Sequence, residues 1–287
     1  MSSAPVEMRW QVHGLGYAGL AWGDPQNRPL LALHGWLDNA ASFALLAPVL
    51  AEHWYVVALD LSGHGKSDWR SPDATYQIYD DLPQILGVID QLGWQQFDLI
   101  GHSRGALIAA LLAAAFPERV SHLVLLDAVA PSPLAPEEFS AQLRRFVLDK
   151  QRLLQRATRV YTSEADAVQT RVQAGLKPEA AALLVSRNLR QCDGGLTWRT
   201  DPRLRGASAV KLTVEQVETM LSSLHMPTLV VAGDDGLGAA HPDHFASLVE
   251  RMPNAVLEFV PGGHHFHMED AIITLAKKIR RLVADSA

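Results

Sequence analysis

Cysteine is nearly absent from this sequence, because Cys192 is the single one among its 287 residues. One cysteine cannot form an internal disulfide, and it has no partner nearby for a cysteine-based metal site. Long apolar runs are missing too: the longest, Ala106–Phe116, is far shorter than the ~20 residues of a membrane-spanning helix. The first ten residues lack the apolar segment of a signal peptide. We therefore expect a soluble, cytoplasmic protein.

Basic residues are in the minority. The 25 Lys and Arg stand against 31 Asp and Glu, which gives a net charge of −6. Nucleic-acid binding needs clustered Lys and Arg opposite the phosphates. The densest basic stretch, residues 144–152, is interrupted by apolar residues and by Asp149, as on a solvated helix face. The composition argues against a nucleic-acid partner and favours a small-molecule one, and it does not indicate an oligomeric state.

Short apolar runs alternate with helical patterns near both ends of the chain. The strand candidates are Met8–Val12, Tyr17–Trp22, Leu30–Leu33, Tyr55–Leu59, Asp98–Ile100, His122–Leu126, Thr228–Ala232 and Leu257–Val260. The later runs are continuously apolar, as in strands covered on both faces. An amphipathic helix is predicted over Tyr76–Leu92. The alternation predicts an α/β fold, with a mostly parallel eight-stranded sheet flanked by helices.

The middle of the chain breaks this alternation. It has helix patterns at 136–160, 163–174 and 178–190, and no convincing parallel strand. An insertion between two strands of a parallel sheet is most simply a lid over the carboxyl edge, where such sheets bind ligands. We therefore expect a core of residues 1–131 and 223–287, with an inserted helical cap of residues 132–222.

The strongest functional signal lies in the segment from Phe97 to Leu107. A strand candidate ends, Gly101-His102-Ser103-Arg104-Gly105 follows, and an Ala/Leu-rich helix begins at once. The pattern G-x-S-x-G between a strand and a helix is typical of a nucleophile elbow. Its two glycines give the backbone room for a strained turn, and the helix N-terminus favours developing negative charge. We predict that Ser103 is a catalytic nucleophile.

Four motifs together carry a family resemblance. They are His34-Gly35-Trp36 after an apolar run, the loop Asp60–Asp68, the elbow Gly101–Gly105, and Gly262-Gly263-His264-His265. With them the sequence resembles the α/β-hydrolase superfamily, near the haloalkane dehalogenases and the serine-hydrolase-like proteins. The resemblance covers residues 8–131 and 223–285, while the cap matches only loosely. It implies the α/β-hydrolase fold.

The elbow departs from the dehalogenase branch. That branch carries an aspartate nucleophile, usually followed by Trp, whereas this chain has Ser103 followed by Arg104. Dehalogenases and epoxide hydrolases form an alkyl ester on the aspartate. A serine would form an alkyl ether, which could not be hydrolysed onward. We therefore expect acyl chemistry.

The resemblance also implies an oxyanion hole made of two backbone N–H groups, those of Trp36 and Arg104. His34 precedes Trp36, and we expect it to shape the loop rather than to act as the base.

The base is expected in residues 260–269, after the last predicted strand. The family pattern selects His264 when Glu269 is aligned with the acidic residue often found five positions on. The dehalogenase spacing selects His265 instead, and we favour His264. A histidine-rich metal tract is the rival interpretation. No Asp, Cys or His set of matching spacing accompanies the tract, so we expect no metal and no other cofactor.

The acid has two candidate places. The commonest family position falls on Gly236, although Asp234 and Asp235 stand close by. Dehalogenases with the acid after the earlier strand resemble the segment around Asp127, and they carry a glycine and an apolar residue where Gly236 and Leu237 stand. We therefore predict Asp127 as the acid. A turn with local side-chain bonds is our interpretation of Asp234 and Asp235.

These residues lead us to expect a serine hydrolase that cleaves a small-molecule carboxylic ester, or a related thioester or lactone, through an acyl-enzyme. An acyltransferase and a carbon–carbon bond hydrolase would use the same triad, and a non-catalytic receptor would keep the same pocket. Apolar residues in the predicted cap suggest an apolar acyl or alcohol group; they include Phe139, Phe146, Leu153 and Trp198.

Overall fold

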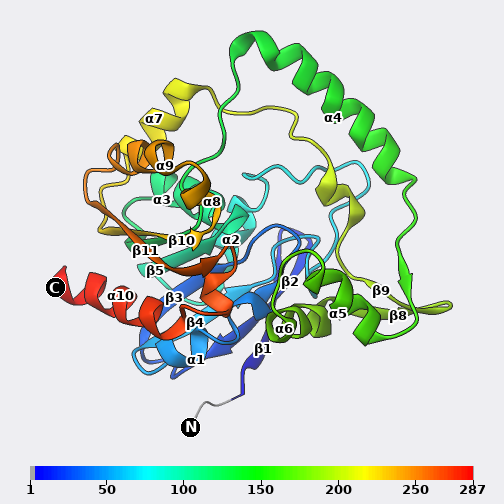
Figure 1. The fold of residues 1–287 in the computed structure, drawn as a ribbon, viewed down its shortest axis with the longest axis horizontal. Helices are drawn as coiled ribbons and strands as arrows, with labels where there is room; N and C mark the ends of the chain where they lie inside the picture. The colour runs from blue at the N-terminus through cyan, green and yellow to red at the C-terminus, as the bar shows by residue number, and fades with distance from the viewer. Residues whose placement is uncertain (1–3, 287) are drawn as a thin grey trace.

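The computed structural model describes residues 4–286 and centres on an eight-stranded sheet (Figure 1). Along the sheet the strands are Val6–Val12 (β1), Leu15–Trp22 (β2), Trp54–Leu59 (β4), Arg28–Leu33 (β3), Phe97–His102 (β5), Val120–Leu126 (β6), Thr228–Asp235 (β10) and Ala255–Gly263 (β11). β1, β2 and β4 pair antiparallel, and every pairing from β4 to β11 is parallel. The predicted eight-stranded, mostly parallel sheet is confirmed.

Helices cover both faces of the sheet with apolar side chains. On one face lie α2 (Leu82–Gln91), α3 (Arg104–Ala115), α7 (Val214–Ser222) and α9 (Pro242–Val249). The other face is covered by the short helices η1 (Ala40–Phe43) and α1 (Ala47–Leu50) and by α10 (Ile272–Asp285). The continuously apolar strands therefore lie between two helical layers. Among the described residues, no helix has the length and apolar character needed to cross a membrane.

An insertion separates β6 from β10. It contains η2 (Pro136–Glu138), α4 (Phe139–Leu154), β7 (Val160–Tyr161), α5 (Glu164–Val172), α6 (Pro178–Asn188), β8 (Leu189–Cys192), β9 (Gly195–Trp198) and η3 (Pro202–Arg205). In Figure 1, α4 stands apart from the sheet at the outer edge of the molecule. The last helix of the predicted cap, α7, instead packs with the core, where Val217 and Leu221 are buried beside α3.

The insertion packs against loops at the carboxyl edge of the sheet. Asn39 donates from Nδ2 to the Leu184 carbonyl at 2.8 Å, and Trp36 donates from Nε1 to the Leu204 carbonyl at 2.9 Å. Both donors follow β3 directly in the chain. These bonds place α6 and η3 over the edge at which β3 ends.

Two predicted elements differ from the structure. The helix predicted over Tyr76–Leu92 begins only at Leu82, where Pro83 occupies the first turn and needs no hydrogen-bond acceptor. The segment before it is held by side chains, since the Tyr76 hydroxyl donates to Asp201 at 2.7 Å. In the insertion, β7, β9 and β8 form a small antiparallel sheet where helices alone were predicted. The dipeptide Asp193-Gly194 between β8 and β9 is a strong hairpin signal.

Candidate active site

Ser103 lies in a strained turn between β5 and α3. Its φ of 51° and ψ of −118° belong to a region that residues other than glycine rarely adopt, at a cost of about 1–3 kcal/mol. The flanking glycines make the turn possible, because a Cβ on Gly101 would lie 2.4 Å from the Gly105 carbonyl oxygen. A Cβ on Gly105 would lie 2.1 Å from the Leu33 carbonyl oxygen. The turn presents Ser103 at the N-terminus of α3.

Asp127 and His264 meet at the carboxyl edge of the sheet. Asp127 follows β6, and His264 follows β11. The Asp127 Oδ2 atom lies 2.7 Å from His264 Nδ1, while Asp127 is fully buried and His264 is partly exposed. Leu237 also donates its backbone N–H to Asp127 Oδ2 at 2.8 Å. The buried carboxylate thus has donors on two sides, and it fixes the orientation of the imidazole.

Gly236 leaves space for the carboxylate of Asp127, which follows β6. A Cβ on Gly236 would lie 2.5 Å from Asp127 Oδ1, so the Asp127 carboxylate fills the space that a side chain at 236 would need. Asp234 and Asp235 are exposed at the end of β10. Asp234 accepts the N–H of Gly262 at 2.8 Å instead of contacting a histidine. Among the described residues, the only carboxylate hydrogen-bonded to His264 is Asp127.

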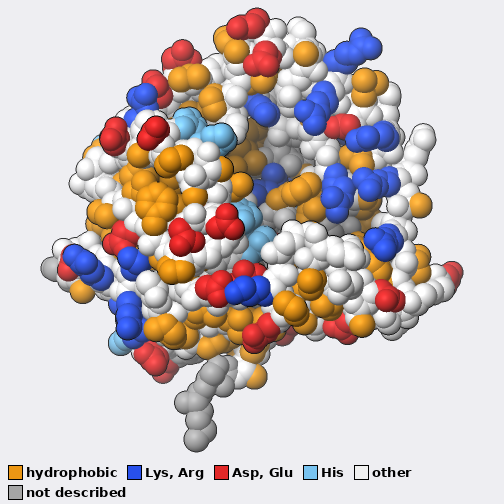
Figure 2. Space-filling model, viewed as in Figure 1, with side chains coloured by type: hydrophobic (Ala, Val, Ile, Leu, Met, Phe, Trp, Pro, Cys, Tyr) orange, Lys and Arg blue, Asp and Glu red, His pale blue; other side chains and the backbone are white. Residues whose placement is uncertain are grey.

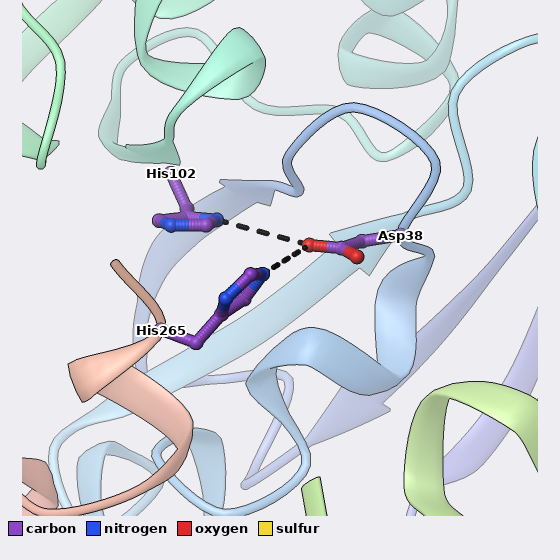
Figure 3. Close-up of side chains that lie close together, drawn as sticks. All are labelled: Asp38, His102 and His265. Carbon is purple, nitrogen blue, oxygen red and sulfur yellow. Dashed lines mark hydrogen bonds and ion pairs between the residues drawn. The ribbon is translucent and has the colours of Figure 1, made fainter. Parts of the chain in front are cut away.

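His265 faces a different partner. Its Nε2 atom lies 3.3 Å from Asp38 Oδ2, and the buried His102 approaches the same oxygen at 3.9 Å (Figure 3). His102 also donates from Nε2 to the His264 carbonyl oxygen at 2.8 Å. The two adjacent histidines therefore have different partners: His264 contacts Asp127, while His265 contacts Asp38.

Two backbone donors without a partner within residues 4–286 are Trp36, in the loop after β3, and Arg104, the residue after Ser103. The loop is shaped by two buried histidines that accept N–H groups: His34 accepts from Leu61 at 3.0 Å, and His64 accepts from Leu37 at 3.3 Å. Burial lowers the pKa of both histidines, which keeps them neutral and able to accept. His34 is thus a structural residue, as predicted.

Asp38 is a site residue that the sequence patterns did not reveal. Burial alone would raise the pKa of Asp38, but its bond to His265 and the charge of Arg171 hold that pKa well below its ordinary value. Arg171 belongs to α5 and forms an ion pair with Asp38. Asp38 therefore links the insertion to the histidine loop. No spacing in the sequence connects residues 38, 171 and 265.

Asp38, His102 and His265 are also the residues that can hold a metal. One ligand atom from each lies within 4.8 Å of the others. The Nδ1 atom of His102 is buried without a hydrogen-bond partner in the described part of the chain. Carboxylate and imidazole ligands of this kind suit zinc. The sequence contained no such set at matching spacing, because Asp38 follows β3, His102 ends β5 and His265 follows β11.

A cavity of about 590 Å³ lies between the insertion and the loop after β3. Trp36 and Leu37 line it from the loop after β3. The segment between α4 and β7, together with residues of α5, α6, β9 and η3, lines it from the insertion. Figure 2 shows a hollow in the middle of one face, with Lys and Arg along one side and His near the other. Of the four apolar residues proposed from the sequence, only Trp198 lines this cavity. Phe146 and Leu153 line a smaller one, and Phe139 is exposed.

Comparisons with known proteins agree with this geometry. A family model described as the alpha/beta hydrolase fold matches residues 28–271. A serine hydrolase-like protein of Danio rerio is 30% identical over 280 residues, which cover 94% of this chain and 86% of the relative.

Two solved structures have the same fold as this chain. The crystal structure of a hypothetical protein from Pseudomonas aeruginosa PAO1 has a TM-score of 0.90 and 37% identity, covering 97% of this chain and 98% of that one. A thioesterase domain from the curacin biosynthetic pathway has a TM-score of 0.84 and 29% identity, covering 97% and 100%.

Proposed function

The chain belongs to the α/β-hydrolase fold family, in its serine-hydrolase-like branch, and from this premise we propose that it cleaves a small-molecule carboxylic ester through an acyl-enzyme. The hydrogen bond between His264 and Asp127 carries the proposal. It joins a histidine and an acid that follow different strands, at the sheet edge where the Ser103 turn also lies. This is the chain order Ser, Asp, His of the family.

In the proposed acylation step, Ser103 Oγ attacks the substrate carbonyl carbon. Asp127 holds the Nδ1–H of His264, so the other ring nitrogen, Nε2, takes the Ser103 proton. The N–H groups of Trp36 and Arg104 donate to the oxyanion, an interaction worth ~3–4 kcal/mol per donor. When the tetrahedral intermediate collapses, the alcohol leaves with the proton from His264.

The deacylation step repeats this chemistry with water. His264 removes a proton from the water, which attacks the acyl carbon to form a second tetrahedral intermediate. When this intermediate collapses, the bond to Ser103 Oγ breaks, His264 returns the proton to that oxygen, and the carboxylic acid leaves. Every protein group in both steps belongs to this chain. We propose that the insertion, residues 132–222, acts as a cap, apart from α7, which packs with the core. In this proposal the cap covers the carboxyl edge of the sheet and selects the substrate.

A thioester is a second candidate substrate. The support is the structure with TM-score 0.84 and 29% identity, which is a thioesterase domain. The same acyl-enzyme forms from an ester and from a thioester, and a thiol leaves in place of an alcohol.

Substitution of the nucleophile tests the proposal. We expect the wild-type protein to hydrolyse p-nitrophenyl esters of some chain length, and Ser103→Ala to lower kcat by about three orders of magnitude or more. The melting temperature of the variant serves as the folding control, because Ser103 is a turn residue with little buried surface. Undiminished turnover by a folded Ser103→Ala protein would refute the proposal.

A further inference from the structure

The cavity beside Trp36 is rich in arginine, although the chain as a whole is acidic. Arg156, Arg159, Arg171 and Arg205 line it, whereas Asp201 is its one acidic lining residue among those described. The chain carries a net charge of −6, so this clustering is not a consequence of overall composition. Lys and Arg side chains gather along one side of the hollow in Figure 2. The positive charge is therefore concentrated in the cavity that Trp36 and Leu37 line.

Two of these charges are already neutralised. Arg171 is paired with the buried Asp38. Asp201 is fully buried and is bound by Arg203 and by the Tyr76 hydroxyl, so it offers nothing to the cavity arginines. Within residues 4–286, the side chains of Arg156, Arg159 and Arg205 form no ion pair or hydrogen bond. The charge of Arg159 contributes to lowering the pKa of Asp166, after that carboxylate's bonds to Thr162 and Ser163. Three guanidinium groups thus remain unpaired around one cavity.

Aromatic rings hold two of the three guanidinium groups in place. Arg205 lies over the Trp36 ring at 5.6 Å from its centre, and Arg159 lies over the Tyr161 ring at 4.8 Å. Such stacking orients a guanidinium, and its N–H donors, which lie in the plane of the guanidinium group, stay free to bind a ligand. Burial lowers the pKa of Arg205, and the nearby charges of Arg156 and Arg171 lower it further. Arg205 and Arg156 therefore lie close enough for their charges to repel, and an anion between them would relieve this repulsion.

We propose that this cavity is a subsite for an anionic group of the substrate, a carboxylate, sulfate or phosphate, held by Arg156, Arg159 and Arg205. The inference rests on the proposed hydrolase function and names the class of its substrate. Trp36 connects the two sites, because its side chain supports Arg205 while its backbone N–H is the proposed oxyanion donor. Arginine forks bind such oxyanions through paired N–H groups. The anion is carried either at the far end of the acyl chain or in the leaving group.

Two matched pairs of substrates test the proposal, and they distinguish an anion on the acyl chain from an anion in the leaving group. The acyl pair is p-nitrophenyl octanoate and the mono-p-nitrophenyl ester of octanedioic acid, which differ by one terminal carboxylate. The leaving-group pair is octanoyl-pantetheine and octanoyl-4′-phosphopantetheine, which differ by one phosphate. We expect the charged member of at least one pair to have a kcat/KM about tenfold higher, since partly exposed ion pairs contribute on this scale.

The arginine variants then locate the effect. Arg205→Gln and Arg156→Gln should each raise KM for the preferred charged substrate severalfold, and by more than they raise KM for the neutral member of the same pair. Arg145→Gln, an exposed change on α4 outside the cavity, is the matched control. Raising NaCl from about 0.05 M to about 0.5 M should remove most of the preference by screening.

The outcomes are distinguishable. Equal kcat/KM within both pairs, or a preference that survives both cavity variants, would overturn the anion subsite while ester hydrolysis by Ser103 remains intact. Hydrolysis of the neutral ester that persists in Ser103→Ala would instead overturn the proposed function itself.

Discussion

Ser103, Asp127 and His264 occupy positions in which the backbone, rather than the side chain alone, determines the geometry. Ser103 and Asp127 both have positive φ, 51° and 52°, and both stand directly at the end of a parallel strand. Motif and resemblance could predict a role for these two residues, because each requires glycine at a particular position in the sequence. Ser103 requires the glycines on either side of it, and Asp127 requires the space that Gly236 leaves.

The roles of Asp38 and His102 could not be predicted in the same way. Asp38 acts through Arg171 and His265, and His102 holds the carbonyl of His264. These contacts join loops that are far apart in the sequence, and no short motif encodes them.

Substitution of Asp127, the proposed acid, tests the triad at the level of single residues. Asp127→Asn should lower kcat by up to about 10⁴, because an amide can hold the wrong tautomer of His264 and cannot stabilise the imidazolium. Asp234→Asn and Asp235→Asn are the matched controls, and each should lower kcat less than about threefold. Initial rates with one p-nitrophenyl ester check all three. A larger loss in either control than in Asp127→Asn would show that the catalytic acid lies at the end of β10.

Among the elements, those of the sheet could be predicted more fully than those of the insertion. Each of the eight strands carries a continuous or alternating apolar run. The inner strands are buried along that run, whereas Val256 and Phe259 of the edge strand β11 are exposed. In the insertion, β8 and β9 are short and half-exposed, so their composition has no clear period. Helix α4 is partly exposed on its apolar side as well, at Leu143, Val147 and Leu148. Contacts with the core, rather than local pattern, therefore fix much of the insertion.

Arg187 is the contact that we expect to hold α6 most strongly. It is 6% exposed and pairs with the fully buried Asp60 carboxylate after β4, and also with Glu7 of β1. Arg187→Met should lower the free energy of unfolding by about 3 kcal/mol, because it leaves a buried carboxylate without its cation. Arg281→Met removes an exposed pair with Asp285 and should cost less than about 1 kcal/mol. Urea denaturation compares the two, and equal losses would contradict this account of the insertion.

Over the whole molecule, buried neutral histidines couple stability to pH. Burial lowers the pKa of His34, His64, His102 and His267, so the folded chain resists protonating them. The unfolded chain protonates each near pH ~6.5. Below that pH the unfolded state binds more protons, so stability that is present above about pH 6.5 is lost as the pH falls.

The size of this loss can be measured by urea denaturation. Between about pH 7.5 and about pH 5.5, each such histidine should remove about 1.4 kcal/mol from the free energy of unfolding. His267→Gln should reduce the pH-dependent loss by roughly that amount, and the exposed His225→Gln should leave it unchanged. An unfolding free energy that is equal at both pH values would contradict the neutral state of these groups.

The central claim, that Ser103 is the nucleophile of a serine hydrolase, is tested most directly by covalent labelling. A fluorophosphonate should add one phosphonyl group per chain, and mass spectrometry of the digest should place it on the peptide that contains Ser103. Ser103→Ala should show no such adduct, and Asp127→Asn should react far more slowly. An adduct on another residue, or labelling of Ser103→Ala at the wild-type rate, would contradict the account.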